Sequence, residues 1–108
     1  MQFKEYQEKA VETAIYGAGS TIIYPTLGLA NEAGEVAGKI KKVLRDNDGN
    51  FDAKSIEGIK GEIGDVLWYM AALCRDLGIS LEDVAQANLT KLYDRRERGV
   101  LQGSGDNR

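Results

Sequence analysis

The chain has 108 residues, enough for one domain, and it is 43% hydrophobic and 29% charged, as is usual for a globular protein. Its 14 basic and 17 acidic residues give a net charge of −3, which disfavours a general nucleic-acid-binding surface, because such a surface needs a basic face to replace counterions. The sequence has no His and a single Cys, Cys74, which excludes His-dependent nucleophilic catalysis, His-ligated metal sites and an intrachain disulfide.

The spacing of apolar residues predicts helices along the whole chain. A first helix is predicted over residues 3–18, where apolar side chains recur every three or four positions until a glycine-rich segment ends the pattern. A second helix is predicted over residues 25–46, because Pro25 suits a first helical turn and Asn47–Asn50 indicates a tight turn.

Capping residues mark the starts of two further helices. The third is predicted over residues 53–77, with Asp52 as its N-cap. The fourth is predicted over residues 81–98, directly after a sequence that resembles a capping box, Ser80–Asp83. No internal repeat is present.

These elements predict an all-α fold, a four-helix bundle in a single domain over residues 1–98, followed by a Gly- and Ser-rich tail over residues 99–108. A short chain with only 7% aromatic residues makes a thin core. We therefore expect the bundle to be completed by oligomerisation, as a homodimer or homotetramer.

The segment at the start of the chain, Met1–Tyr6, is charged and no apolar core follows it, so we expect no signal peptide. No apolar run approaches the roughly 20 residues that a membrane helix needs. The sequence therefore predicts a cytoplasmic protein with a reduced thiol, no membrane partner and no nucleic-acid partner.

Two acidic pairs have the same helical spacing. Glu32 and Glu35 lie in the second predicted helix, and Glu62 and Asp65 lie in the third. Residues three apart on a helix share a face. Both pairs are equally distant from the centre of the predicted turn, so an antiparallel hairpin places Glu35 level with Glu62, and Glu32 level with Asp65.

The four carboxylates adjoin the apolar stripes of their helices, so they repel one another and lose hydration. Protonation or a divalent cation relieves both costs, and oxygen ligands alone select Mg²⁺, Mn²⁺ or Ca²⁺. The alternative is that each pair lies on a solvated face, and the shared register of the two pairs disfavours it. Nearby glycines favour close approach of the backbones or a ligand: Gly34, Gly38, Gly58, Gly61 and Gly64.

The segments Leu29–Val36 and Gly61–Leu67 resemble the two acidic motifs of the MazG-like family, E-x-x-E on one helix and E-x-x-D on the next. This family belongs to the all-α nucleoside triphosphate pyrophosphohydrolases, together with dimeric dUTPases and dCTP pyrophosphatases. The segments Asn88–Leu92 and Gln102–Arg108 also resemble short members of the group, so the likeness extends over nearly the whole chain.

The resemblance implies hydrolysis of a nucleoside or deoxynucleoside triphosphate to the monophosphate and pyrophosphate, as nucleotide-pool housekeeping. It also implies that Mg²⁺, with Mn²⁺ as a substitute, is held by Glu32, Glu35, Glu62 and Asp65, where it orients the triphosphate and activates water. Glu32 and Glu35 are the candidates for polarising that water, and the sequence does not choose between them. Asn31 stands where many members have an additional Glu, so no role of that carboxylate carries over.

The resemblance also implies contacts with substrate from the fourth predicted helix. Asn88 and Lys91 match family positions that contact sugar or phosphate, and Arg95 follows on the same face. For Lys91 and Arg95 a solvated basic face is the alternative.

Other candidates lie in phase with the acidic residues. Lys39 and Lys42 are in phase with Glu35, and Tyr69 is in phase with Asp65, so each is a candidate for contacting phosphate. The balancing of nearby carboxylates by the lysines and an edge-of-core position for the tyrosine are the alternatives. Candidates for a base pocket are Gln7, Tyr24 and Trp68, although a place in the core is the favoured interpretation of Trp68.

A competing hypothesis keeps the fold without the activity. A helical oligomerisation or interaction module needs no carboxylate group, whereas this sequence has both acidic motifs intact. A ferritin-like di-iron bundle needs Glu-x-x-His pairs, which a chain without His does not provide.

Overall fold

The computed structural model describes residues 1–108 and consists of helices joined by turns, which confirms the all-α fold class. The α-helices are α1 (Phe3–Ala10), α2 (Ile23–Asp46), α3 (Ala53–Asp76) and α4 (Leu81–Glu97). For the second, third and fourth helices, the predicted bounds differ from these by no more than two residues.

The first predicted helix is too long. α1 ends at Ala10 and is followed by two 3₁₀ turns, Val11–Thr13 and Ala18–Ser20. The hydroxyl of Thr13 donates a hydrogen bond to the Ala10 carbonyl at 2.7 Å and accepts one from Trp68 Nε1 at 2.8 Å. The contact with Trp68 therefore holds Val11–Thr13 in a 3₁₀ turn, whereas the apolar spacing alone predicts an α-helix there.

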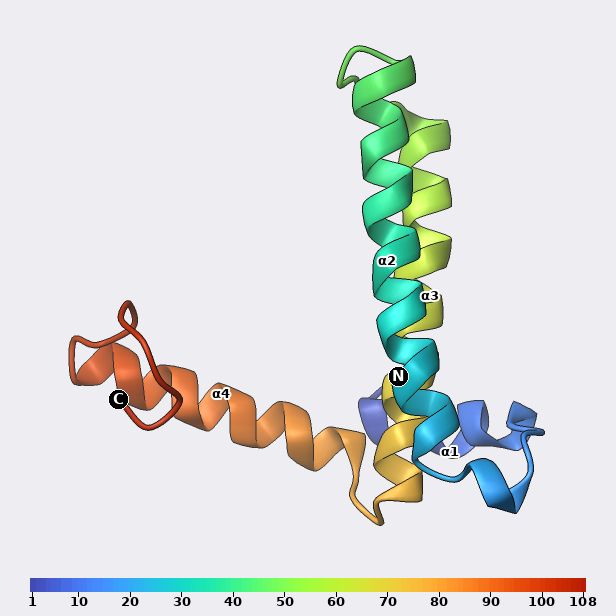
Figure 1. The fold of residues 1–108 in the computed structure, drawn as a ribbon. Helices are drawn as coiled ribbons and strands as arrows, with labels where there is room; N and C mark the ends of the chain where they lie inside the picture. Colours follow the sequence, from blue (N-terminus) through green and yellow to red (C-terminus); the bar gives the residue numbers. More distant parts are fainter.

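The helices α2 and α3 form a long antiparallel hairpin (Figure 1). In the turn between them Asp48 and Gly49 have positive φ values of 51° and 75°. The Asp52 carboxylate then caps α3 by accepting a hydrogen bond from the Ser55 amide at 2.8 Å. This connection brings the middle of α2 level with the middle of α3.

A buried carboxylate at the end of α3 fixes the start of α2. Asp76, whose side chain is 4% exposed, accepts hydrogen bonds from the Ile22 amide at 2.9 Å and from the Tyr16 hydroxyl at 2.8 Å. Ile22 has a φ of 70°, which is unfavourable for a β-branched residue. Asp76 therefore stabilises the strained turn that precedes α2, and this turn sets the direction of the helix.

Asp76→Asn is expected to destabilise the protein at neutral pH by about 2 kcal/mol, because the hydrogen bonds to a charged acceptor are lost. Burial raises the pKa of Asp76, but hydrogen bonds from Ile22, Tyr16 and Arg75 outweigh it and leave the pKa below its usual value. The stabilisation is therefore present above the unfolded pKa of about 3.9 and is lost as pH falls through the folded pKa.

Thermal denaturation of the wild type and the variant between neutral and acidic pH tests this expectation. The difference in stability should shrink with acid. Asp48→Asn is the control, because that carboxylate is exposed in a turn whose φ also suits Asn. A difference that is constant with pH would contradict the role given to the Asp76 charge.

The fourth helix extends away from the hairpin (Figure 1). Its start is held by the side-chain amide of Gln7. The Nε2 of Gln7 donates to the carbonyls of Ala71 and Ile79 at 3.3 and 3.2 Å, and its Oε1 accepts from the backbone N–H of Leu81 at 2.9 Å. Next to these contacts lies a small core cluster of Ala71, Cys74 and Leu81. The contacts of Gln7 therefore set the direction of α4.

The single chain is extended and thinly packed. Its radius of gyration is 16.8 Å, whereas a compact domain of about 100 residues has roughly 13 Å. Only seven of 108 residues are buried, so the four helices do not close into a bundle within one chain. None of the helices combines the length and the apolar character needed to span a bilayer.

Candidate functional site

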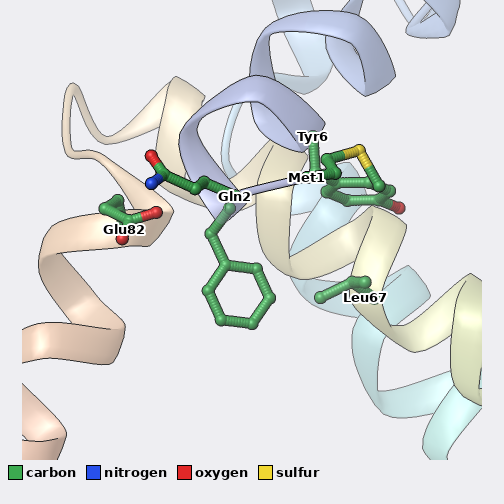
Figure 2. Close-up of a pocket in the computed structure, with 6 residues that line it drawn as sticks. Met1, Gln2, Tyr6, Leu67 and Glu82 are labelled. Carbon is green, nitrogen blue, oxygen red and sulfur yellow. The ribbon is translucent and has the colours of Figure 1, made fainter.

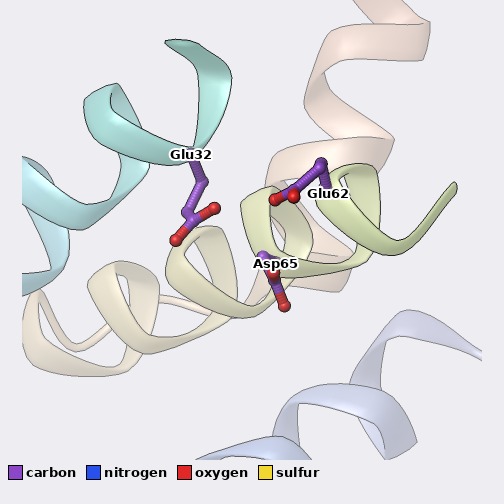
Figure 3. Close-up of side chains that lie close together, drawn as sticks. All are labelled: Glu32, Glu62 and Asp65. Carbon is purple, nitrogen blue, oxygen red and sulfur yellow. The ribbon is translucent and has the colours of Figure 1, made fainter. Parts of the chain in front are cut away.

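Three carboxylates converge between the two helices of the hairpin. Glu32 comes from α2, while Glu62 and Asp65 come from α3, and each provides an oxygen within 4.8 Å of the others. In Figure 3 the Glu32 side chain points from its helix toward the other two. Glu32 and Glu62 are half-buried and Asp65 is exposed. We call these three residues the acidic group.

Glu35 lies outside the acidic group and is exposed. Its carboxylate is not among the three that lie within 4.8 Å of one another, although its charge still acts on Glu32. The structure thus brings together three of the four carboxylates singled out in the sequence. The register between the helices places Glu32 near Asp65, and the Glu35 carboxylate lies beyond the 4.8 Å that joins the three.

Crowding of like charges perturbs Glu32. Loss of hydration, a hydrogen bond shared with Glu62 and the neighbouring charges of Asp65, Glu62 and Glu35 raise its pKa above the usual value. A divalent cation would relieve this repulsion. Oxygens bound to one Mg²⁺ at about 2.1 Å lie at most about 4.2 Å apart, so small side-chain movements would fit the acidic group to the ion.

The acidic group borders a cavity of about 400 Å³ that is lined by Thr13, Glu32, Asp65, Trp68 and Tyr69. Trp68 Nε1 donates hydrogen bonds to Thr13 Oγ1 at 2.8 Å and to the Ala10 carbonyl at 3.2 Å. The half-buried indole is therefore a fixed wall of this cavity. Thr13 is not a candidate from sequence, because it lies inside the first predicted helix and has no distinctive spacing.

Aromatic side chains extend this wall. The Tyr69 ring lies edge-on to Trp68, with centroids 5.0 Å apart, and 6.1 Å from the ring of Tyr24. Tyr24 in turn stacks on Tyr16 at 4.9 Å. A hydrogen bond with Tyr24, burial and the nearby charges of Glu32 and Asp65 raise the pKa of Tyr69. Its hydroxyl therefore stays protonated at neutral pH and can donate a hydrogen bond.

The two candidate lysines of α2 lie toward the hairpin turn. Lys39 Nζ is 4.0 Å from Glu62 Oε1, which places one cation at the edge of the acidic group. Lys39 and Lys42 both line a second cavity of about 520 Å³, together with Lys54. Asp46 and Asp52 line the same cavity, so its charge is mixed, and Lys39 is the cation that lies next to the acidic group.

The candidates on α4 are not brought to the acidic group within one chain. Asn88 is exposed, and Lys91 and Arg95 form ion pairs with Asp106 in the tail. Gln7 is also placed elsewhere, since its amide is engaged by three backbone groups at the α1, α3 and α4 junction. These positions depend on the direction of α4, which no local pattern in the sequence specifies.

A further cavity of about 250 Å³ lies where α1, α3 and α4 meet (Figure 2). Four of its six lining residues are hydrophobic, and its one carboxylate, Glu82, accepts a hydrogen bond from the Lys4 amide at 3.1 Å. It offers no group of carboxylates for a cation. The chemistry of the chain is therefore concentrated at the acidic group.

Comparisons with known proteins agree with the arrangement of the motifs. Residues 24–100 match the family model described as the MazG nucleotide pyrophosphohydrolase domain. The chain is 50% identical over 109 residues to the gene 37 protein of Mycobacterium phage L5. The alignment covers 95% of this chain and 96% of the phage protein. No solved structure matches the chain. The matched range of the family model contains the whole acidic group and α4.

Proposed function

Since this chain belongs to the MazG nucleotide pyrophosphohydrolase family, we propose that it hydrolyses a nucleoside or deoxynucleoside triphosphate between the α and β phosphates. The products are the monophosphate and pyrophosphate, and the role is housekeeping of the cytoplasmic nucleotide pool. The observation that supports the proposal is the acidic group, of which Glu32 and Asp65 line a cavity of about 400 Å³.

In this proposal Glu32, Glu62 and Asp65 hold Mg²⁺, with Mn²⁺ as a substitute. The bound ion would neutralise and orient the phosphate oxygens and lower the pKa of a water molecule. Glu32 is better placed than Glu35 to polarise that water, because it belongs to the acidic group.

The remaining residues around the cavity suit a triphosphate with a planar base. The Lys39 ammonium group at the edge of the acidic group offsets negative charge on the phosphates, and the Tyr69 hydroxyl donates to a phosphate oxygen. Thr13 and the fixed Trp68 indole offer a wall for sugar or base, because an aromatic face can stack on any base. Tyr24 supports this wall through Tyr69.

A product assay tests the proposal. The eight common ribo- and deoxyribonucleoside triphosphates are incubated with the protein in Mg²⁺ or in EDTA, and the products are separated by chromatography. We expect monophosphate and pyrophosphate in equal amounts, with no turnover in EDTA. Release of orthophosphate and a diphosphate would contradict the bond assignment, and a folded protein that turns over none of them would favour the non-catalytic module.

We also propose that the active form is a homodimer or homotetramer. Apolar side chains are exposed on two separate surfaces, one on α4 and one on the distal half of the hairpin. They are Val84, Leu89 and Leu92 on the first, and Ile40, Leu44 and Ile56 on the second. Burial of both surfaces against other copies would close the bundle that one chain leaves open, and would bring α4 cations to a neighbouring hairpin.

Sedimentation equilibrium at micromolar concentration is expected to give at least twice the monomer mass of 11.8 kDa for the wild type. Leu92→Asp should shift the population toward monomer while the helical circular dichroism is retained, because a charge is placed in the buried contact. Gln86→Asp adds the same charge to the same helix at a polar, exposed position and should leave the mass unchanged. A monomeric wild type would contradict the assembly.

A further inference from the structure

The C-terminal tail folds back onto α4 (Figure 1). Asp106 Oδ1 accepts hydrogen bonds from Lys91 Nζ at 2.8 Å and from Arg95 Nη2 at 3.0 Å, and the Asp106 carbonyl also accepts from Arg95. The loop is closed by the Arg108 guanidinium, which donates to the carbonyls of Val100, Leu101 and Gly105. The two cations on α4 are thus engaged by an internal carboxylate.

The partners of this ion pair are buried to very different extents. The Arg95 side chain is 7% exposed, whereas that of Asp106 is 76% exposed. A buried guanidinium needs an anionic partner, since an unpaired buried charge is strongly destabilising. Water, in contrast, already solvates most of the Asp106 carboxylate and offsets its loss from the pair. The arrangement therefore stabilises an anion beside Arg95 without fixing which anion it is.

We propose that the tail is a self-inhibiting latch, in which Asp106 occupies the phosphate-contacting position beside Lys91 and Arg95 when no ligand is bound. The ligand that displaces it is a phosphoanion. That this ligand is the triphosphate of a nucleotide rests on the proposed function. The anion site itself rests on the contacts of the tail.

The exchange of ligands follows from charge and geometry. A guanidinium presents several N–H donors in one plane, which match two oxygens of a phosphate group. Asp106 brings one negative charge, while a di- or triphosphate brings several charges and more acceptor oxygens. The hydrogen bonds from Lys91 and Arg95 lower the pKa of Asp106, so the carboxylate is charged at neutral pH and competes for the same donors.

The tail is built to reverse direction. Gly103 and Gly105 have φ values of 137° and 86°, which glycine adopts without the steric penalty of a side chain. Apart from the Arg108 contacts, Asp106 provides the hydrogen bonds between the tail and the two α4 cations. Removal of the side-chain charge should therefore weaken the hold of the tail on both cations, with only the Asp106 carbonyl still accepting from Arg95, and should leave α4 unchanged.

The test measures binding of inorganic triphosphate by isothermal titration calorimetry, in EDTA and at low ionic strength. EDTA prevents a metal–triphosphate complex from forming at the acidic group. Asp106→Asn keeps the shape of the side chain and removes its charge. We expect it to tighten the dissociation constant about fivefold, the factor that corresponds to an ion pair at the upper end of the range for exposed pairs.

Asp94→Asn is the matched control. It makes the same charge change on the helix that carries Lys91 and Arg95, but its carboxylate pairs with Arg98, at 2.8 Å, and not with either of these two cations. It should leave the dissociation constant nearly unchanged. Addition of Lys91→Ala to Asp106→Asn should reverse the gain in affinity.

Equal affinity in the wild type and Asp106→Asn, or equal tightening by Asp94→Asn, would overturn the latch. Because binding is measured without metal and without hydrolysis, this outcome is independent of the product assay. Tighter binding by Asp106→Asn in a protein that hydrolyses no nucleotide would support the anion site and leave the proposed function contradicted. Hydrolysis of nucleotides together with unchanged triphosphate binding by Asp106→Asn would support the proposed function and contradict the latch.

Discussion

Glu32→Gln is expected to lower kcat/KM for the preferred nucleotide by more than about 100-fold. Mutation of a residue that only hydrogen-bonds a metal ligand already lowers metal affinity or activity by about 10- to 100-fold. Glu32 is the one member of the acidic group on α2, so without its charge the remaining ligands come from α3 alone. In EDTA the variant should melt at a higher temperature than the wild type, since like-charge repulsion is relieved. Steady-state kinetics with Mg²⁺ titration and thermal melts measure both effects.

Glu35→Gln is the decisive comparison. It makes the same chemical change on the same helix, but Glu35 is exposed and lies outside the acidic group. We expect it to retain activity close to that of the wild type. If Glu35→Gln lowers kcat/KM as much as Glu32→Gln does, Glu35 also belongs to the metal site of the active protein. The four carboxylates predicted from the sequence would then describe that site better than the acidic group of the single chain.

Gly28→Ala is expected to destabilise the protein by about 1–3 kcal/mol, the usual cost of forcing a methyl group into a filled space. A Cβ at this position would overlap the Tyr69 ring. The ring sits between Tyr24 and Trp68, so it cannot move without disturbing the wall of the cavity. Catalytic activity should therefore fall together with stability. Chemical denaturation and the product assay provide the two measurements.

Gly34→Ala separates the effect of packing from that of helix propensity. Gly34 lies in the same helix, and a Cβ there would meet nothing within 4 Å. Since alanine is favoured over glycine in a helix interior by roughly 1 kcal/mol, this variant should be more stable than the wild type. Equal stability of Gly28→Ala and Gly34→Ala would mean that Tyr69 does not require the space above Gly28.

Local signals account for the parts of the fold that the sequence predicted well. Asp52 and Ser80 both accept hydrogen bonds from their helices, at Ser55 and Asp83, so the starts of α3 and α4 are determined by neighbouring residues. The end of α1 is different. It depends on the contact between Thr13 and Trp68, and apolar spacing carries no information about a partner 55 residues away.

The candidate site was likewise predictable only where it follows from local helix geometry. The spacing of the acidic pairs and the position of the turn were sufficient to bring Glu32 level with Asp65, because both are consequences of helix geometry. Spacing alone does not separate Glu35 from the group, because Glu62 and Asp65 are also three residues apart and both belong to it; the separation depends on how the side chains of the hairpin pack. The separation of Lys91 from the acidic group depends on the path of α4, which Gln7 and the positive φ of Gly78 direct.

The location of the acidic group on a single hairpin has a consequence for the order of folding. Glu32 and Asp65 meet once two neighbouring helices close around a short turn, whereas the contacts of Trp68 with Thr13 and of Gln7 with Ile79 join distant parts of the chain. Contacts that are near in sequence form sooner, because less chain entropy is lost. Like charges are therefore drawn together before Thr13 fixes the Trp68 indole, and a divalent cation present during folding would speed the closure of the hairpin.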